Sequence, residues 1–228
     1  LNYVPPVPNK LGQVILDDYP ITNLLPYIDW TPFFISWGLT GKYPKILQDD
    51  VVGEAARDLF DNADELLHKM IEEKSIVAKG VFKLMPARRT DSDTVTVYDN
   101  APADGGKPTY QFEHLRQQSN RSQEGASGKP NFSLADFISP SDNHIDHLGG
   151  FTVSIVGTEA LAEQYKAAGD DYNAIMVQAL SDRLAEAFAE HLHELIRKDY
   201  WGYQPTESLT NDEMIKEKYV GIRPAPGY

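Results

Sequence analysis

The chain has 228 residues, of which 41% are hydrophobic and 24% are charged, and it contains no cysteine. This composition excludes global disorder, and the length favours a single domain. The formal net charge is −13, from 34 acidic and 21 basic residues. It argues against a nucleic-acid-binding protein and against an anionic membrane partner, since both need a basic surface. Without cysteine, disulfides, thiolate nucleophiles and thiolate metal sites are excluded.

The sequence also lacks the features of membrane insertion and secretion. Its longest uncharged run, between Asp29 and Lys42, contains Pro32 and is far shorter than the roughly 18 residues of a membrane span. The first residues, LNYVPPVPNK, do not have the basic and then apolar pattern of a signal peptide. We therefore expect no membrane association and a cytoplasmic location, which the absence of cysteine also fits.

The first third of the chain predicts an extended segment followed by helices. Residues 1–20 contain four prolines and predict an extended N-terminal arm. The aromatic stretch 27–43 follows neither a strand nor a helix period, which predicts buried irregular structure with a short helix after Pro32. Over residues 50–74 the apolar positions recur every three or four residues, which predicts an amphipathic helix preceded by two aspartates.

The middle of the chain predicts a sheet. Apolar and polar residues alternate there, and the predicted strands are 80–86, 93–99, 109–115, a possible strand at 130–138, and 151–156. The polar stretch 120–130 predicts a loop. Because hairpin-like pairs of strands follow one another without helical crossovers, we expect the sheet to be antiparallel.

Helices dominate the last third. Thr158 is predicted to cap a short helix that ends at Gly169. The strongest predicted element is a long helix near 171–200, which has a continuous apolar stripe. Thr210 and Glu213 form a capping-box pattern for a last helix. Together these elements predict one α+β domain.

Two histidine pairs raise the question of a metal site. His144 and His147 lie beside two aspartates and could bind a divalent cation, although a solvated polar loop is the simpler interpretation. His191 lies on the apolar stripe of the long helix, whereas His193 is rotated by about 200° from it. The second pair cannot converge on one ion unless another element contributes, so we expect core packing for His191 and exposure for His193. We predict no metal site.

Asp29 stands in the aromatic sequence YIDWTPFF. A carboxylate enclosed by aromatic rings needs a cationic or hydrogen-bonding partner. Asp29 could cap a helix, pair with a lysine or arginine, or accept the ammonium group of a ligand, and helix capping is the simplest of these. The neighbouring rings could also stabilise a cationic ligand through cation–π attraction.

The C-terminal sequence RPAPGY (223–228) is the second segment suited to ligand binding. Its prolines hold the backbone extended, which leaves backbone N–H and C=O groups free to bind a flat heterocycle. Gly227 permits close approach, and the guanidinium of Arg223 matches a carboxylate. Composition alone also fits a proline-rich tail.

These segments, in this order, resemble the C-terminal reactivation domain of cobalamin-dependent methionine synthase. The stretches that carry the resemblance are 27–47 (YIDWTPFF and WGLTGKYPKIL), LRQQ (115–118), LADF (134–137), 170–205, and GIRPAPGY (221–228). The resemblance implies that residues 1–228 form one C-shaped α+β domain, with a twisted antiparallel sheet, flanking helices and one long helix near 171–200. The family domain continues beyond this motif, so the resemblance also implies a truncation after RPAPGY.

The function implied by the resemblance is a repair step. The domain binds S-adenosylmethionine and supports reductive remethylation of inactive cob(II)alamin, which another module of the parent enzyme holds. The chain is then part of a methyltransferase, and the fragment is not expected to catalyse the full reaction. The implied partners are the cobalamin-binding module and flavodoxin or a flavoprotein reductase. A non-catalytic docking module for the same partners is the alternative.

The resemblance also implies a set of residues that bind S-adenosylmethionine: Asp29, Glu186, Arg223, Ala225, Gly227 and Tyr228. Arg223 would bind the ligand carboxylate, and Asp29 a cationic or hydrogen-bond-donating part. The Ala225 backbone would meet the adenine, and Tyr228 would flank the methyl group or the cobalamin. Glu186 projects opposite the apolar stripe of its helix, so a solvated position is the alternative for it.

Docking of flavodoxin, which is usually acidic, would require a local basic face on this acidic chain. The candidates are Lys42 with Lys45, Arg88 with Arg89, and Arg116 with Arg121.

Overall fold

A computed structural model describes residues 3–118, 130–140 and 144–225. The chain divides into two compact units. The first comprises Leu1–Val14, Phe82–Phe151 and Lys198–Pro205, and the second Ile15–Val81, Thr152–Arg197 and Thr206–Tyr228. The predicted loop at 120–130 lies outside the described residues except for Pro130.

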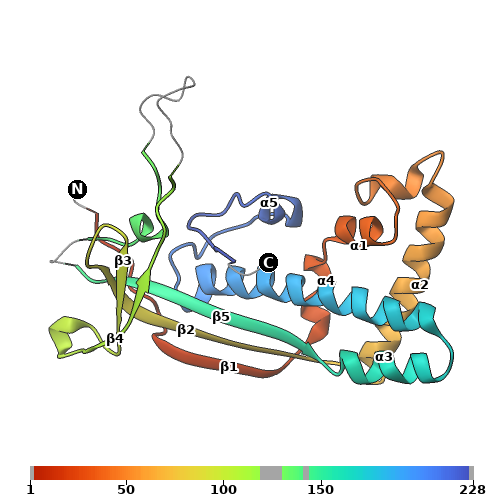
Figure 1. The fold of residues 1–228 in the computed structure, drawn as a ribbon, viewed down its shortest axis with the longest axis horizontal. Coiled ribbons are helices and arrows are strands. Elements are labelled where there is room, and N and C mark those ends of the chain that lie inside the picture. Colours follow the sequence, from red (N-terminus) through yellow and green to blue (C-terminus); the bar gives the residue numbers. More distant parts are fainter. Residues whose placement is uncertain (1–2, 119–129, 141–143, 226–228) are drawn as a thin grey trace. The chain divides into compact units, whose positions relative to one another are not determined.

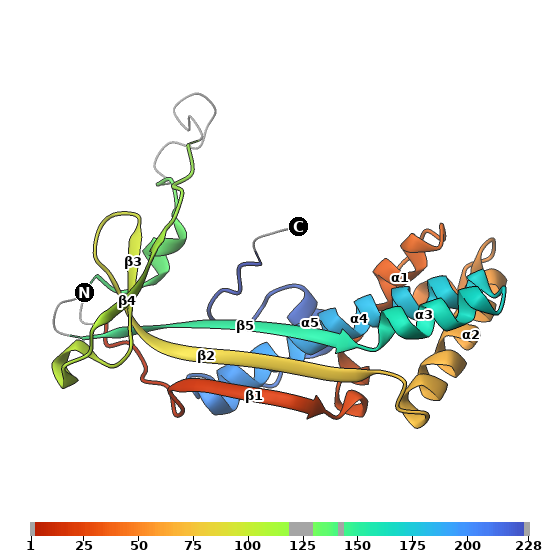
Figure 2. The same cartoon turned by 60° about the horizontal axis from the view of Figure 1, so that its bottom comes forward.

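The described strands form a five-stranded antiparallel sheet. In the order β1-β2-β3-β4 each strand pairs with the next, and β5 pairs with β2, so that β1, β2 and β5 run alongside one another (Figure 2). The strands are β1 (Gly12–Tyr19), β2 (Val77–Arg89), β3 (Thr94–Tyr98), β4 (Pro108–Glu113) and β5 (Asp146–Val156). The predicted α+β class with an antiparallel sheet is confirmed, as are the strands expected at 80–86, 93–99, 109–115 and 151–156.

One predicted strand is absent from the described residues, and one strand was not predicted. Residues 130–138 form no strand, because the Ser133 side chain accepts a hydrogen bond from Ala135 N, and the Asp136 carboxylate accepts one from Ser133 N at 2.9 Å. This capping box starts a single 3-10 turn, Leu134–Phe137. Conversely, the predicted arm contains β1, which lies in the part of 1–20 that is free of proline and can therefore pair in a sheet.

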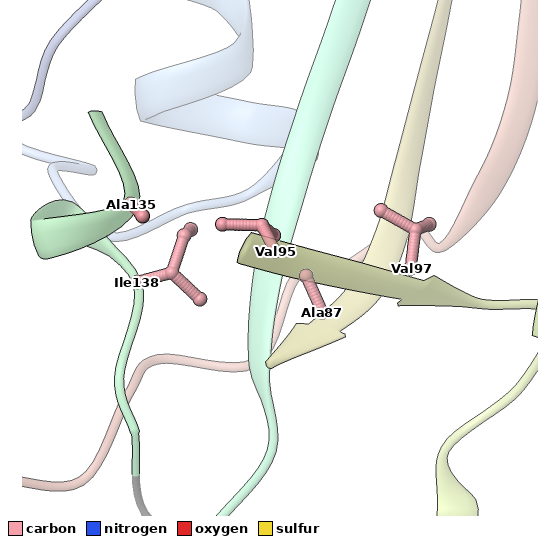
Figure 3. Packing of buried hydrophobic residues seen from close by; sticks show 5 residues of the cluster. All are labelled: Ala87, Val95, Val97, Ala135 and Ile138. Atoms are coloured by element: carbon pink, nitrogen blue, oxygen red, sulfur yellow. The ribbon is translucent and has the colours of Figure 1, made fainter. Parts of the chain in front are cut away.

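The core of the first unit is a small cluster between β2, β3 and the segment after β4. Ala87 pairs with Val97 across the β2–β3 ladder, and both side chains are fully buried. Figure 3 shows the cluster, which comprises Ala87, Val95, Val97, Ala135 and Ile138.

The second unit contains five α-helices in its described residues: α1 (Trp30–Ser36), α2 (Gly53–Glu72), α3 (Thr158–Ala167), α4 (Asp171–Leu195) and α5 (Asn211–Ile215). Helix α4 packs against α1, α2 and α3, and Figure 1 shows α3 alongside it. A π-helical turn, Ile196–Tyr200, continues α4. The predicted helices at 50–74 and 171–200 are therefore confirmed.

The ends of these helices show how the local sequence fixes them. Asp49 accepts hydrogen bonds from Val51 N and Val52 N just before α2, and the predicted Thr210–Glu213 capping box of α5 is confirmed. The predicted Thr158 cap was wrong. The N-cap of α3 is Gly157 at φ +102°, where a Cβ atom would lie 2.4 Å from the carbonyl oxygen of Ser75.

Candidate functional site

Asp29 is the N-cap of α1. Its Oδ1 accepts a hydrogen bond from Thr31 N at 2.9 Å, so the helix begins at Trp30, two residues before the predicted start at Pro32. The capping interpretation of Asp29 is thereby confirmed. The Trp30 ring after it makes edge contacts with Phe33 and Phe60, at centroid distances of 5.4 and 4.9 Å. The cap uses one of the two carboxylate oxygens.

Arg223 forms an ion pair with Glu190 of α4, through Nη2 and Oε1. The two side chains are only 17% and 16% exposed. Nε of Arg223 and Oε2 of Glu190 are buried and have no hydrogen-bond partner among the described residues. The pair therefore uses one hydrogen bond, and each group keeps a second buried polar atom.

Glu186 lies one helical turn before Glu190. Burial raises the pKa of Glu190, the positive charge of Arg223 lowers it, and the negative charge of Glu186 raises it again. Arg197 also lowers the pKa of Glu190 and Glu217 also raises it, so three carboxylates and two guanidiniums act on one another where the C-terminal segment meets α4. Sequence reasoning missed Glu190, although its position four residues after Glu186 places it on the same face of the helix.

Arg197 anchors the same segment from the end of α4. Its side chain is fully buried, its Nε donates to Oε2 of Glu207 at 2.9 Å, and its Nη1 lies 2.7 Å from Nδ1 of His193. The guanidinium also lies 4.4 Å from the ring centroid of Tyr219, a cation–π contact. These contacts hold residues 207 and 219, which flank α5, against α4.

His193 is buried, so the prediction that it is exposed was wrong. Burial, together with the positive charges of Arg197 and Arg223, lowers the pKa of His193 to about 3. The neutral ring can accept a hydrogen bond from Arg197. The helical periodicity places His193 away from the apolar stripe and so predicts exposure. Its burial depends instead on its polar contact with Arg197, which periodicity does not reveal.

His191 is buried as predicted, and its Nε2 lies 2.7 Å from the hydroxyl of Tyr19. The interpretation of His144 and His147 as part of a solvated loop was wrong for His147, which is 2% exposed at the start of β5. The carboxylate of its neighbour Asp146 accepts hydrogen bonds from Ser139 N and His147 N. The described residues contain no group of three or more His, Cys, Asp or Glu side chains that could hold a metal ion.

The structure brings together some of the predicted site residues. Arg223 and Glu186 both lie near Glu190. None of the hydrogen bonds or ion pairs among the described residues joins Asp29 to Arg223. Ala225 is exposed and lies outside regular secondary structure, as an extended binding segment requires, while Gly227 and Tyr228 lie outside the described residues.

The candidate basic residues differ in how they are paired. Arg89 and Arg116 both bind the carboxylate of Asp136, which neutralises part of their charge. Lys42 and Lys45 are exposed before α2. Arg121 lies outside the described residues.

No helix in the described ranges combines the length and the apolar character that are needed to cross a membrane.

Comparisons with known proteins identify the family and the fold. The family described as "Vitamin B12 dependent methionine synthase, activation domain" matches residues 20–228. A solved structure, described as a crystal structure of the MetH reactivation domain bound to AdoHcy, has 47% sequence identity and a TM-score of 0.92; the match covers 99% of this chain and 67% of that chain. Since the family match extends over most of the sequence and the fold is shared, the chain belongs to the activation-domain family of vitamin B12-dependent methionine synthase.

Proposed function

We propose that this chain binds S-adenosylmethionine and supports the reductive remethylation of inactive cob(II)alamin in cobalamin-dependent methionine synthase. The observation that carries the proposal is the 47% identical structure, which is bound to AdoHcy and matches 99% of this chain. AdoHcy is what remains when S-adenosylmethionine gives up its methyl group. The ion pair of Arg223 with α4 adds support, because it holds a carboxylate-binding group at a defined place.

The ligand-binding roles follow from the chemistry of each group. Arg223 keeps N–H groups beyond its bond to Glu190 and binds the ligand carboxylate. Asp29 and Glu186 interact with cationic or hydrogen-bond-donating parts. The extended backbone at Ala225 meets the adenine. Gly227 permits close approach of the ligand, and Tyr228 flanks the methyl group or the cobalamin.

The chemical step makes few demands on the protein. When a methyl group leaves a sulfonium, the departing thioether is neutral, so no general acid is needed. The contribution of this chain is then to position the methyl group, an effect that can be worth up to about 7–11 kcal/mol. Cobalamin, held by another module of the parent enzyme, supplies the cobalt that accepts the methyl group.

The proposed partners are the cobalamin-binding module and flavodoxin or a flavoprotein reductase, which supplies one electron. An acidic flavoprotein needs a local basic surface for docking. Lys42 and Lys45 fit this need better than Arg89 and Arg116, because Asp136 pairs with both arginines.

Calorimetric titration with S-adenosylmethionine tests the proposal. We expect the wild-type chain to bind, and Arg223→Ala to bind at least about tenfold more weakly, because a charge-assisted pair is lost. Lys166→Ala, which changes an exposed cation on α3, is the matched control and keeps wild-type affinity. Equal affinity in Arg223→Ala would reject the Arg223 assignment. A wild-type chain that binds flavodoxin but no S-adenosylmethionine would instead support the non-catalytic docking module.

A further inference from the structure

We propose that Tyr27 and Asn211 are positioning residues, which hold the segment around Asp29 in place for ligand binding. The inference rests on the proposed function, in which Asp29 and Arg223 contact the same ligand. None of the hydrogen bonds or ion pairs among the described residues joins these two side chains directly, so their spacing has to be fixed through other contacts. Tyr27 and Asn211 supply two such contacts, one on α4 and one on α5.

Tyr27 connects the Asp29 segment to α4. It lies two residues before Asp29, at the end of the 3-10 turn Leu25–Tyr27, and this turn packs against α4. The Tyr27 hydroxyl donates a hydrogen bond to Oε2 of Glu194. Burial and the neighbouring carboxylate of Glu194 raise the pKa of the Tyr27 hydroxyl, so it stays protonated and remains a donor at neutral pH.

The acceptor of this bond lies close to the partner of Arg223. Glu194 follows Glu190 by four residues, so the two carboxylates lie on the same face of α4, one helical turn apart. Glu190 pairs with Arg223. The Asp29 segment and the C-terminal segment are therefore attached to neighbouring turns of one helix. Because sites built on helices hold their geometry more precisely than sites on loops, these two attachments fix the spacing within the proposed site.

The orientation of the Tyr27 ring is fixed as well. The ring contacts that of His191 at a centroid distance of 4.5 Å, and the hydroxyl of Tyr19 lies 2.7 Å from Nε2 of the same histidine. His191 is itself buried in α4. Since one contact holds the ring of Tyr27 and another holds its hydroxyl, the side chain is restrained in one orientation, and it restrains the backbone that leads to Asp29.

Asn211 provides a second contact at the residue between Tyr27 and Asp29. Nδ2 of Asn211, at the start of α5, donates a hydrogen bond to the carbonyl oxygen of Ile28 at 3.5 Å. Because α5 precedes the C-terminal segment in the chain, this bond connects the Asp29 segment to the part of the chain that leads to Arg223. The bond is long, so we assign it the smaller effect.

Positioning of this kind acts on ligand affinity. A ligand that bridges two groups makes both contacts at full strength only when the groups are held at the correct spacing. When a restraint is lost, both binding groups remain, but part of the binding free energy is consumed in ordering the loosened segment. Affinity therefore falls although the positioning residue does not contact the ligand, and the effect depends on the presence of the Asp29 carboxylate.

A double-mutant cycle on the affinity for S-adenosylmethionine tests the proposal. Calorimetry gives the dissociation constants of the wild type, Tyr27→Phe, Asp29→Ser and the double variant. Asp29→Ser keeps an oxygen that can cap α1 and removes the carboxylate. Tyr165→Phe is the matched control, because it removes another tyrosine hydroxyl that links two helices of the same unit, α3 and α2, through Lys69.

We expect Tyr27→Phe to weaken binding by about three- to tenfold, as for the loss of one hydrogen bond, and Tyr165→Phe to keep wild-type affinity. In the Asp29→Ser background, Tyr27→Phe should weaken binding by less than about twofold, because the group that it positions is gone. Equal weakening in both backgrounds would show that Tyr27 does not act through Asp29 and would overturn the proposal. Wild-type affinity in Tyr27→Phe would overturn it as well.

Two substitutions of Glu194 separate the hydrogen bond from the charge. Glu194→Gln keeps an acceptor oxygen for the Tyr27 hydroxyl, whereas Glu194→Ala removes it. The affinity of Glu194→Gln should therefore exceed that of Glu194→Ala by about threefold or more. Equal affinities of the two variants would contradict the role of this hydrogen bond.

Asn211→Ala takes the place of Tyr27→Phe in the cycle if Tyr27→Phe fails to fold, which circular dichroism would reveal. It should weaken binding by about two- to threefold, and only when Asp29 is present. If the wild type binds S-adenosylmethionine and neither Tyr27→Phe nor Asn211→Ala changes the affinity, the positioning role is wrong while the proposed function stands. If the wild type does not bind S-adenosylmethionine, the proposed function itself fails and this inference fails with it.

Discussion

Arg197 and Glu207 form a buried ion pair that ties the end of α4 to the segment leading to α5. Their side chains are 0% and 6% exposed, and Nε of Arg197 lies 2.9 Å from Oε2 of Glu207. A buried guanidinium without a counter-charge is strongly unfavourable. The fold of the C-terminal segment therefore depends on a polar contact as well as on apolar packing.

Glu207→Gln should destabilise the protein by about 3–5 kcal/mol, because it leaves the charge of Arg197 buried without compensation. Urea unfolding followed by circular dichroism measures the change in the free energy of unfolding. Lys166→Met is the control, since it breaks an exposed pair with Glu163 and should cost no more than about 1 kcal/mol. Similar losses in the two variants would contradict the assigned importance of the buried pair.

His193 should make stability depend on pH in the mildly acidic range. Its pKa is lowered to about 3 in the folded protein, against about 6.5 in the unfolded chain. Between these values the unfolded state binds a proton that the folded state does not. The contribution of His193 to the free energy of unfolding is therefore fully present above about pH 6.5. It is lost as the pH decreases towards 3, by at most about 1.4 kcal/mol per pH unit.

Substitution of this histidine tests that dependence. His193→Gln keeps a hydrogen-bond acceptor for Arg197 and removes the titration. The free energy of unfolding should then vary less between pH 6.5 and 5, a window in which most carboxylates remain ionised. If the free energy of unfolding changes equally with pH in the wild type and the variant over this window, His193 does not cause the pH dependence.

Asp29 can have two roles that different substitutions separate. Asp29→Ala removes the cap of α1 and should cost about 1 kcal/mol of stability. Asp29→Ser keeps a capping oxygen and should restore most of that loss. If Asp29 also contacts the ligand, Asp29→Ser will still bind S-adenosylmethionine more weakly than the wild type. Thermal unfolding measures the stability of both variants, and calorimetry measures their affinity for S-adenosylmethionine. Wild-type affinity in Asp29→Ser would show that Asp29 acts only as the helix cap.

The long helix α4 was predictable because its pattern of apolar residues extends over many turns and depends only on neighbouring residues in the sequence. Apolar positions recur throughout α4, and Asp170 caps its start by accepting a hydrogen bond from Asn173 N at 3.0 Å. Strand β1 was not predictable in the same way, since its sequence follows prolines and its partner, β2, is more than 50 residues away in the chain. Strand pairing of this kind is a tertiary effect.

The site was predictable only where a motif identified it. Arg223 and Glu186 were expected from the resemblance, and the structure brings both close to Glu190. Glu190 and the Arg197–Glu207 pair escaped prediction because their roles depend on contacts with distant segments. From sequence alone, a glutamate on a helix is predicted to be exposed to solvent, because its partner is not known.

Gly80 should not tolerate a larger side chain, because β2 passes close to α4 there. A Cβ atom on Gly80 would lie 2.9 Å from Cζ of Phe188, whose ring stacks on Tyr19 at a centroid distance of 5.0 Å. Gly80→Ala should cost about 1–3 kcal/mol through overpacking. Phe188→Leu should lower the free energy of unfolding less in the Gly80→Ala variant than in the wild type. Urea unfolding of the wild type, the two single variants and the double variant measures this coupling. Additive losses would contradict the predicted clash.

The exposed lysines before α2 should control association with an acidic flavoprotein. Lys42 and Lys45 are exposed, and on a chain with a net charge of −13 such a local basic surface counteracts repulsion during encounter. We expect the double variant Lys42→Glu and Lys45→Glu to associate with flavodoxin about tenfold more slowly at low salt, with the difference shrinking at high salt as charges are screened.

A double variant of two other exposed lysines, Lys83→Glu and Lys107→Glu, changes the net charge equally and separates local from global electrostatics. If the location of the charge matters, this control will slow association less than the change at Lys42 and Lys45. Stopped-flow measurements over a range of salt concentrations distinguish the two cases. Equal slowing by both pairs would mean that the total charge alone governs the encounter, and the assignment of the docking surface to Lys42 and Lys45 would then be wrong.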